Sequence, residues 1–530
     1  MRRWNGWGDD SIDYPLTASS QRFLERLVGS GMKPGDAAIQ ELLQRMPKSR
    51  LREHPSVSTD ALHRLTHARG QSFPDWLDLR SGRLDTFPDG VAYPISEEDV
   101  YDLIQYATRH GYCIVPYGGG TSVVGHIDVE KGKKPVLTID MSRMNRLTDL
   151  DTRSLQATFQ AGVSGPDLEA QLRANGCTLG HYPQSFEYST LGGWIATRSS
   201  GQQSLRYGRI ERMFAGGRIE TPTGTLVIPS FPASAAGPDL REIVLGSEGR
   251  LGIITEACVR ISPIPDNEEY HAVFFPDFMH GIEAVRQILA SGIQCCMLRL
   301  STPNETSTTL ALAGHENLIG ALERLLKIRG LGKEKCMLLL GFNGKASLVR
   351  VNRSEALDIT SKWDGVHVGK TFGEQWHKNR FKTPYLRNTL WEMGYGIDTL
   401  ETAIQWGKTP QMVEQIETAL HQTMAGFGEK VHVFTHLSHI YPHGSSVYTT
   451  YLFRLNASPE ETLHQWQAMK AAASREIVSL GGTISHQHGV GTDHLPYLVE
   501  EKGTLGIKTI TNLYHQFDPK GTMNPGKLVM

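Results

Sequence analysis

The sequence predicts an α+β protein with two large parts, because strand-like and helix-like patterns alternate along most of its 530 residues. Over residues 85–265, short apolar runs alternate with helical patterns and glycine turns, which is typical of a nucleotide-binding domain. Over residues 266–475, strand patterns recur with helices between them, which favours a second domain with an antiparallel sheet. No internal repeat interrupts this order.

The first part of the chain is expected to be helical over residues 17–66. Apolar residues recur at helical spacing in RFLERLVGSGM and DAAIQELLQRM, and Pro34 and Gly35 separate the two segments. In the next part, residues 97–111 are predicted to form a helix opened by a capping box of Ser96 and Asp99. Strands are predicted at DGVAYPIS, YCIVPY, KPVLTID and SLQATFQAG, and a further helix at GPDLEAQLRANG.

The second half continues the alternation. Strands are predicted at EEYHAVFFPD, CMLRLSTP, MLLLGFNG and SSVYTTYLFRL, helices at HGIEAVRQILASG and at the long segment that starts SPEETLHQW, and a short strand at GGTIS. A last helix precedes a tail rich in proline and glycine. We therefore divide the chain into a helical segment (1–84), two domains (85–265 and 266–475) and a C-terminal segment (476–530) that completes the active site and the first of these domains.

Composition excludes several classes of protein. The net charge is −2, from 54 basic and 56 acidic residues, so no global basic field favours nucleic acid. Six cysteines without a CxxC pair indicate reduced thiols rather than a disulfide framework. The sequence has no signal-peptide pattern and no run of about 18 apolar residues. We expect a cytoplasmic protein, with membrane contact limited to peripheral binding through the N-terminal helices.

Three stretches of small residues are the sharpest local features. PYGGGTS (residues 116–122) follows an apolar strand, and its glycines and hydroxyls suit an anion such as a pyrophosphate. STLGGWIATR (189–198) and GSEGRLGIIT (246–255) are of the same kind. No GxGxxG motif follows a strand, which argues against a Rossmann site for NAD. Three such loops spread over the chain favour an extended dinucleotide that lies along a groove.

The spacing of these stretches resembles the FAD-binding domain of the vanillyl-alcohol-oxidase and p-cresol-methylhydroxylase superfamily. Within it the chain is similar to the alkyldihydroxyacetonephosphate synthases, on RRWNGWG, TLGHYPQSFEYSTLGGWIATR and GPDLREIVLGSEGRLGIITEA, and the similarity covers nearly the whole chain. The resemblance implies a two-part FAD-binding (PCMH-type) domain plus an antiparallel-sheet substrate (cap) domain with helices on one face. It also implies a homodimer, and a lipid-type substrate whose acyl chain is exchanged for a fatty alcohol without net redox change.

The resemblance also implies which residues bind FAD. The cofactor is expected to be non-covalent, since no histidine stands at the flavin-linking place of the GGGTS turn and His126 lies several residues further on. The implied FAD contacts are Pro116, Tyr117, Gly118, Gly119, Gly120, Thr121, Ser122, Gln184, Ser189, Thr190, Gly193, Ala196, Thr197, Ser199, Glu248, Gly252, Ile253 and Ile254.

Candidate chemistry comes from the same resemblance. Tyr448 matches the acid/base tyrosine, and we expect neighbouring cations to lower the pKa of its phenol. Arg387 matches the arginine that binds the substrate phosphate, and Arg299 and His181 match further substrate-binding positions. His486 and His488 match two of three histidines, with Gln487 between them. On an extended segment these two would point to opposite sides, so we expect only one to face the flavin.

Two other functions stay open on the sequence. The tail FDPKGTMNPGKL is similar to that of FAD-linked 2-hydroxy-acid dehydrogenases, some of which bind a divalent metal through two histidines seven residues apart. His436 and His443 have that separation but lack the Gly-Asp-Gly-Asn core, so we expect no metal. A flavin-fold binding protein without turnover is the third class, and the presence of Arg387, Tyr448 and His488 together argues against it.

Overall fold

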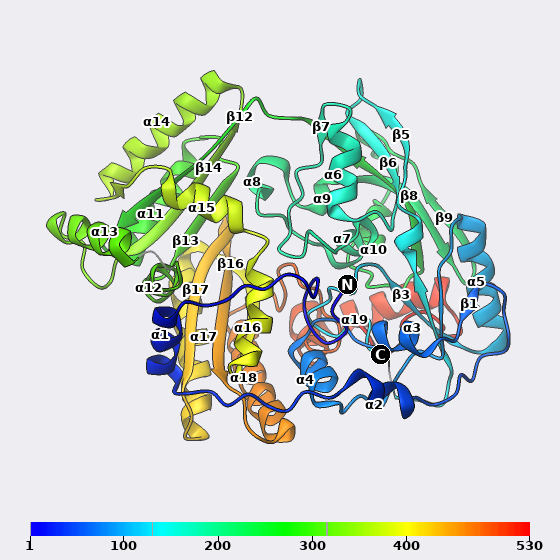
Figure 1. Ribbon diagram of the computed structural model, residues 1–530. Coiled ribbons are helices and arrows are strands. Elements are labelled where there is room, and N and C mark those ends of the chain that lie inside the picture. Colours follow the sequence, from blue (N-terminus) through cyan, green and yellow to red (C-terminus); the bar gives the residue numbers. More distant parts are fainter. Residues whose placement is uncertain (1, 130, 314–315, 530) are drawn as a thin grey trace.

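The structure is a computed structural model, and it describes residues 2–129, 131–313 and 316–529 (Figure 1). Its strands form three main sheets and a short extra pair. Two of the sheets belong to one half of the molecule, and the third, largest sheet forms the core of the other half (Figure 1).

The first sheet has the order β1-β2-β4-β3 and carries the first glycine stretch. β3 pairs with β4 in parallel, so the chain leaves β3 at one end of the sheet and enters the glycine turn directly. The sheet packs on α5, whose N-cap Ser96 accepts a hydrogen bond from the Asp99 N–H, as half of the predicted capping box. The strands are β1 (Val57–Ser58), β2 (Gly90–Ala92), β3 (Cys113–Tyr117) and β4 (Val136–Asp140), and α5 is Glu97–His110.

The second sheet is antiparallel, with the order β5-β6-β10-β8-β9. The second and third glycine stretches lie at α7 and directly before β10. The elements here are β5 (Leu147–Asp151), β6 (Gln156–Gln160), α6 (Gly165–Arg173), β7 (Cys177–Thr178), α7 (Leu191–Thr197), α8 (Ser204–Tyr207), α9 (Ile210–Met213), β8 (Phe214–Thr221), β9 (Gly224–Ile228), α10 (Arg241–Val244), β10 (Ile253–Arg260) and β11 (Ser262–Pro263).

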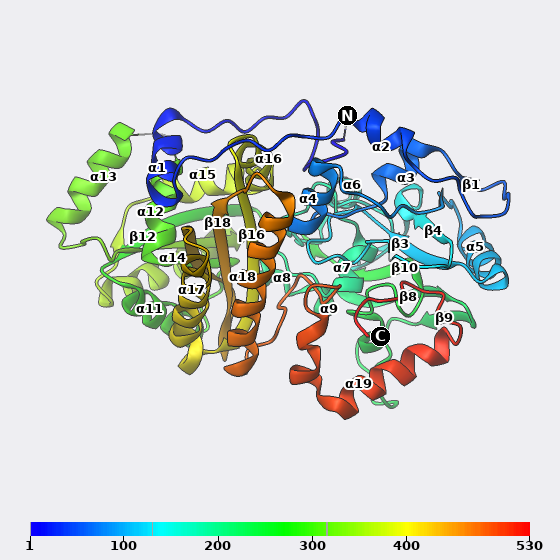
Figure 2. The ribbon, with the colours of Figure 1, turned by 90° about the horizontal axis from the view of Figure 1, so that it is seen from below.

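The third sheet has seven antiparallel strands in the order β15-β12-β14-β13-β17-β18-β16. One face is covered by α11, α14, α17 and α18, which lie on the same side in Figure 2. The strands are β12 (Asn267–Phe275), β13 (Met297–Ser301), β14 (Cys336–Gly344), β15 (Val366–His367), β16 (Tyr395–Gln405), β17 (Val431–Tyr441) and β18 (Gly444–Arg454), and the helices are α11 (Phe278–Ala290), α14 (Ala346–Lys362), α17 (Thr409–Gly426) and α18 (Pro459–Ser479).

Part of the other face is covered too, by shorter helices that the sequence pattern did not indicate. Strand residues on this face, such as Tyr270 and Phe274, pack with Leu310 and Leu326 in a separate core. The covering helices are α12 (Pro303–Leu312), α13 (Glu316–Ile328) and α15 (Thr371–Asn379), and α16 (Leu386–Glu392) follows them. The rest of this face, formed by side chains of β16, β17 and β18, is directed toward the FAD half.

The N-terminal segment crosses from one half of the molecule to the other, whereas the last helix lies on the half that holds the first two sheets (Figures 1 and 2). Near the N-terminus, the Trp7 N–H donates to Asn388 Oδ1 at 3.1 Å, and Asn388 Nδ2 donates to the Trp7 carbonyl at 2.9 Å. The N-terminal helices are α1 (Ala18–Val28), α2 (Ile39–Gln44), α3 (Ala61–Thr66) and α4 (Phe73–Ser81), and the last helix is α19 (Leu498–Phe517). In the part of the chain described, no helix has the length and apolar character needed to cross a membrane.

Two local predictions were wrong. The helix expected from residue 36 begins only at Ile39, since the residues before it contact α4 instead: the Ala37 N–H donates to the Arg80 carbonyl at 2.7 Å, and Asp36 pairs with Arg80 at 2.8 Å. GGTIS forms no strand. That segment instead makes isolated hydrogen bonds along β16, from the Thr483 N–H to the Ala403 carbonyl and from the His486 N–H to the Glu401 carbonyl.

Candidate active site

The first two glycine stretches are in direct contact. A Cβ atom at Gly119 would overlap the Tyr188 carbonyl, and one at Gly118 would overlap the Thr190 hydroxyl. Thr190 also caps α7 by accepting from the Gly193 N–H at 3.3 Å. Only glycine allows this approach, so the turn after β3 and the entry to α7 present main chain to the same space.

The third glycine stretch contacts the first two. The Glu248 N–H donates to the Ala196 carbonyl at 2.9 Å, and the Gly246 N–H to the Ile195 carbonyl at 3.1 Å. A Cβ atom on Gly249 would lie 2.9 Å from Pro116 Cγ. All three stretches therefore converge, as the sequence predicted, and they form a cradle of small residues that suits an extended dinucleotide.

Several of the predicted FAD contacts are engaged within the protein. Ser189 Oγ accepts from Trp194 Nε1 at 2.7 Å, and Thr197 Oγ1 donates to the Gly193 carbonyl at 3.0 Å. Gln184 Nε2 donates to the Arg380 carbonyl at 2.6 Å, which ties this loop to the other half of the molecule. Gly252, Ile253 and Ile254 are buried where β10 begins beside β8. Their contribution is to shape the loops rather than to offer side chains.

Glu248 links these loops to the C-terminal segment. Its carboxylate accepts from the Val490 and Gly491 N–H groups at 2.5 and 2.9 Å, and lies 3.3 Å from His126 Nε2. Asn524 Nδ2 donates to the Glu248 carbonyl at 2.7 Å and to the His126 carbonyl at 3.0 Å. The tail that is similar to those of 2-hydroxy-acid dehydrogenases therefore packs on the FAD-side loops, and does not discriminate between reactions.

Tyr448 lies at the centre of the second group of side chains. In the cross-strand register it is directly opposite Glu401 on β16 and His436 on β17. The His436 ring stacks on it, with centroids 4.9 Å apart and planes at 20°, and the His488 ring meets it edge-on at 5.8 Å. Neighbouring strands and one loop thus place two imidazoles against the phenol.

The pKa of Tyr448 contradicts the sequence prediction. Burial raises it well above the ordinary value, and the Glu401 carboxylate raises it further. Arg387 lowers the pKa of the phenol, but this effect is smaller than the other two. The prediction considered the cations and missed the buried Glu401 carboxylate on the neighbouring strand, and burial and this carboxylate together favour the protonated phenol.

Arg387 lies in the first turn of α16 and faces the same cluster. Its guanidinium lies over the Trp76 ring, 4.4 Å from the centroid, and Nη1 donates to the Gln71 carbonyl at 2.8 Å. The Gln71 N–H in turn donates to the Ser122 carbonyl at 2.6 Å, at the end of the first glycine stretch. Arg387 and Tyr448 each affect the other's pKa, so the cation is close to both the phenol and the cradle.

Arg299 and His181, the two further substrate-binding candidates, make contacts within the protein. Arg299 pairs with the buried Glu305, which also contacts His436 Nδ1 at 2.9 Å. Burial raises the pKa of Glu305, but Arg299 and His436 outweigh this and bring it to about 2. His181 is buried against Ser199 and Trp194, and burial lowers its pKa to about 3. Both residues support the walls of the site.

The two loop histidines do not point apart. His486 Nδ1 lies 2.9 Å from Glu401 Oε1, and His488 Nε2 lies 3.7 Å from Glu401 Oε2. Gln487 Nε2 donates to the same carboxylate at 2.6 Å. The prediction of opposite faces was wrong because the segment is a bend and not a strand. Glu401 was missed, since one glutamate within an apolar strand pattern carries no signal in the sequence.

His436 and His443 do not form a pair. His436 stands in the middle of β17, whereas His443 is exposed in the turn between β17 and β18. Seven residues of extended chain separate the two by about 20 Å. Among the described residues, no group of three or more His, Cys, Asp or Glu side chains is arranged to hold a metal ion.

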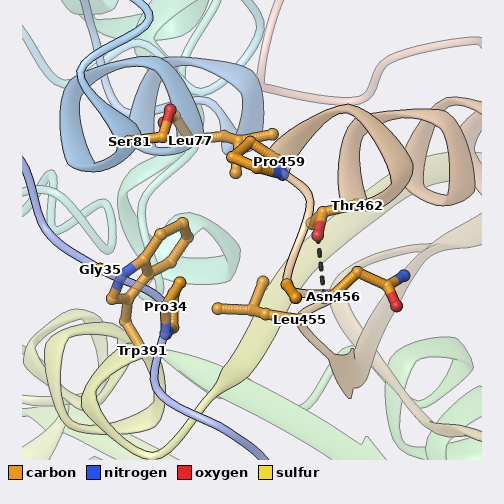
Figure 3. Close-up of a pocket in the computed structure, with 10 residues that line it drawn as sticks. Pro34, Gly35, Leu77, Ser81, Trp391, Leu455, Asn456, Pro459 and Thr462 are labelled. Atoms are coloured by element: carbon orange, nitrogen blue, oxygen red, sulfur yellow. Dashed lines mark hydrogen bonds between the residues drawn. The ribbon is translucent and has the colours of Figure 1, made fainter.

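A small pocket lies apart from this cluster, between the N-terminal segment, α4, α16 and the start of α18 (Figure 3). Its walls include Pro34, Leu77, Trp391 and Leu455, and no residue that lines it carries a charge. The pocket offers no group for acid–base chemistry. The candidate site is therefore the Tyr448 cluster beside the glycine cradle.

Two family models match the chain: "FAD binding domain" over residues 88–229 and "FAD linked oxidases, C-terminal domain" over residues 264–528. An alkyldihydroxyacetonephosphate synthase of Dictyostelium discoideum is 35% identical over 480 residues, which are 89% of this chain and 78% of that protein. The chain belongs to the alkyldihydroxyacetonephosphate synthase family. It is an FAD-dependent enzyme.

Solved structures agree with this family. An alkyldihydroxyacetonephosphate synthase structure superposes with a TM-score of 0.85 at 30% identity, over 99% of this chain and 98% of that chain. p-Cresol methylhydroxylase with bound substrate shares the fold, with a TM-score of 0.69 at 14% identity over 97% and 98%. Oxidoreductase relatives are less similar: a mitochondrial D-lactate dehydrogenase of Arabidopsis thaliana is 25% identical over 97% of this chain and 86% of that protein. The predicted PCMH-type fold is confirmed.

Proposed function

We propose that the enzyme exchanges the acyl chain of acyl-dihydroxyacetone phosphate for a fatty alcohol, in ether-lipid synthesis and without net oxidation. The observation that carries the proposal is the placement of Arg387. A guanidinium suits a phosphate, and this one lies between Tyr448 and the Gln71–Ser122 link to the glycine cradle. An anionic head group held there brings the carbon next to it within reach of the phenol.

The glycine cradle would hold FAD without a covalent bond. The Cβ positions of Gly118 and Gly119 are closed by neighbouring groups, so main-chain N–H and carbonyl groups line the cradle. His126 faces Glu248, at 3.3 Å, and this contact supports non-covalent binding of the flavin. Bound FAD would supply the covalent chemistry at the ester-bearing carbon.

The chain's own residues have separable tasks in this proposal. Arg387 binds the phosphate, and Tyr448 gives a proton to the leaving carboxylate or takes one from the incoming alcohol. The His488 and His436 rings pack against the phenol ring and fix its orientation. Arg299 and Glu305 fix the His436 ring. A homodimer and peripheral binding to the membrane that supplies the alkyl chains complete the proposal.

One experiment separates this reaction from the dehydrogenase alternative. The purified holoenzyme is incubated without oxygen with acyl-dihydroxyacetone phosphate and a labelled fatty alcohol, and in parallel with 2-hydroxy acids. We expect label in the lipid product and an unchanged flavin spectrum with the hydroxy acids. Bleaching of the flavin by a hydroxy acid, with no label incorporated, would overturn the proposal and favour the dehydrogenase.

A further inference from the structure

Glu401 is the most enclosed carboxylate of the site. Its side chain is 0% exposed, and its contacts come from three consecutive residues of one loop: His486 at 2.9 Å, Gln487 at 2.6 Å and His488 at 3.7 Å. None of these partners is a lysine or arginine. A buried carboxylate that is merely structural is normally paired with a fixed cation, because burial of an uncompensated charge is costly.

The carboxylate is nevertheless held in its charged form. Burial alone raises the pKa of Glu401, but His486, His439 and His488 together lower it well below the ordinary value. The carboxylate is therefore held by imidazoles and an amide rather than by a fixed cation, and an imidazole that donates from one ring nitrogen can accept at the other. Glu401 in turn opposes the lowering of the His488 pKa by burial.

One branch of contacts leads from Glu401 through His486 to Tyr441. With its Nδ1–H donated to Glu401, His486 has Nε2 free to accept, and the Tyr441 hydroxyl lies 2.6 Å from that atom. Arg209 Nη1 donates to the same hydroxyl oxygen at 3.3 Å. If the phenol O–H bond breaks and a bond to Nε2 forms, the tyrosinate lies against Arg209 and the imidazolium against Glu401, so both new charges are compensated.

The second branch leads to Tyr448. His488, which is 3.7 Å from the carboxylate, meets the Tyr448 ring edge-on, and Tyr448 is itself the cross-strand neighbour of Glu401. One carboxylate is thus linked through two histidines to two phenols, those of Tyr441 and Tyr448. Other titratable or charged groups that face this cluster are His436 and His439 of β17, Asp398 of β16, Lys470 of α18 and Arg209 before α9.

We infer that Glu401 is a positioning residue for proton transfer, acting through His486 on the Tyr441 hydroxyl and through His488 on Tyr448. The inference rests on the proposed function, since it assigns a task within the same site. It adds Tyr441 and Arg209 to the set of residues that handle protons. Neither was indicated by the sequence.

The test replaces the carboxylate in the holoenzyme. In Glu401→Gln the hydrogen bonds remain available but the charge is gone, and Glu401→Asp keeps the charge on a shorter side chain. Glu220→Gln is the matched control, because Glu220 on β8 is equally buried and pairs with Arg218, away from the site. FAD content, KM, kcat and the pH profile of alkyl exchange are measured for each from about pH 5 to 9.

We expect Glu401→Gln to retain FAD and KM but to lose kcat by about tenfold or more. Its pH profile should move to lower pH, because the pKa of His488 is lowered by burial and loses the opposing effect of Glu401. Glu401→Asp should keep the profile with a smaller loss. A wild-type profile in Glu401→Gln, or equal loss of FAD in both variants, would refute the inference.

A second measurement does not depend on turnover. Histidine ring signals of the enzyme, labelled with ¹⁵N, are titrated by NMR in the wild type and in Glu401→Gln. We expect the His488 ring to lose its proton at lower pH in the variant, and an unchanged titration contradicts the inference. Failure of the wild type to exchange alkyl chains would count against the proposed function alone, because the titration still reports on Glu401.

Discussion

The two halves of this enzyme recognise their ligands by opposite means. In the FAD half, the cradle is built where side chains are absent, at Gly118, Gly119 and Gly249. In the other half, the site is built from side chains around Tyr448 that make aromatic ring contacts and ion pairs with one another. Added atoms should therefore harm the first half most, and removed atoms the second.

The largest effect is expected from Gly119→Ala. The new methyl group would occupy the place of the Tyr188 carbonyl, a main-chain atom that cannot rotate away. We expect loss of bound FAD and a fall in the free energy of unfolding of about 3 kcal/mol. Flavin absorbance after desalting and chemical denaturation measure the two. Gly407→Ala, where a Cβ meets nothing within 4 Å, is the control, and a yellow, stable Gly119→Ala would break the comparison.

Tyr448→Phe tests the opposite half by removing one oxygen. We expect a fall in kcat of about a hundredfold or more with FAD retained, because the ring still packs on His436 but has no proton to transfer. Steady-state kinetics of alkyl exchange measure this. Tyr395→Phe loses a hydroxyl that donates to the Gly29 carbonyl far from the site, and should keep its activity. Full activity of Tyr448→Phe would remove its acid/base role.

Arg387→Lys should give a smaller, substrate-specific effect. An ammonium cannot keep both the stacking on Trp76 and a bidentate grip on phosphate, so we expect KM to rise about tenfold, or about 1.4 kcal/mol. An analogue without the phosphate should be handled equally by variant and wild type. Arg454→Lys, in the ion pair with Glu429 at the C-terminal end of β18, is the control. An unchanged KM would place the phosphate elsewhere.

The smallest effect on activity is expected from Glu417 on α17, behind the cap sheet, where only the pH dependence of stability should change. Burial raises its pKa from 4.5 to about 7, while the Thr435 hydroxyl lowers it. The folded state therefore binds this proton more tightly than the unfolded state, and stability falls as the pH rises from about 4.5 to about 7. Glu417→Gln should be more stable than wild type by about 3 kcal/mol at high pH and equal to it at low pH.

Thermal unfolding at both ends of that pH range measures the Glu417 effect. Glu414→Gln, on the exposed side of the same helix, should change stability at neither pH. A constant difference between Glu417→Gln and wild type across the range would mean that the carboxyl is not neutral when folded.

The difference between the halves also decided what the sequence could predict. The cradle was predicted from PYGGGTS and the two other glycine stretches. Only glycine allows two main-chain segments to approach so closely, and runs of glycine are visible in the sequence. The chemical half needed the resemblance for Tyr448 and Arg387. Glu401 and Arg209 were missed because their importance comes from strands and loops brought together by folding. α12 and α15 were missed because short helices that pack on the second face of a sheet lack a long apolar period.

Arg2 donates a hydrogen bond to the Gly119 carbonyl, and its guanidinium lies 5.2 Å from the Tyr188 ring centroid. Asn524 holds the carbonyl of Glu248 on the other side of the same cradle. The two contacts come from opposite ends of the chain, so the complete cradle requires nearly the whole polypeptide, from Arg2 to Asn524, to have been synthesised and folded. A nascent or truncated chain that lacks either end cannot assemble the cradle in this form.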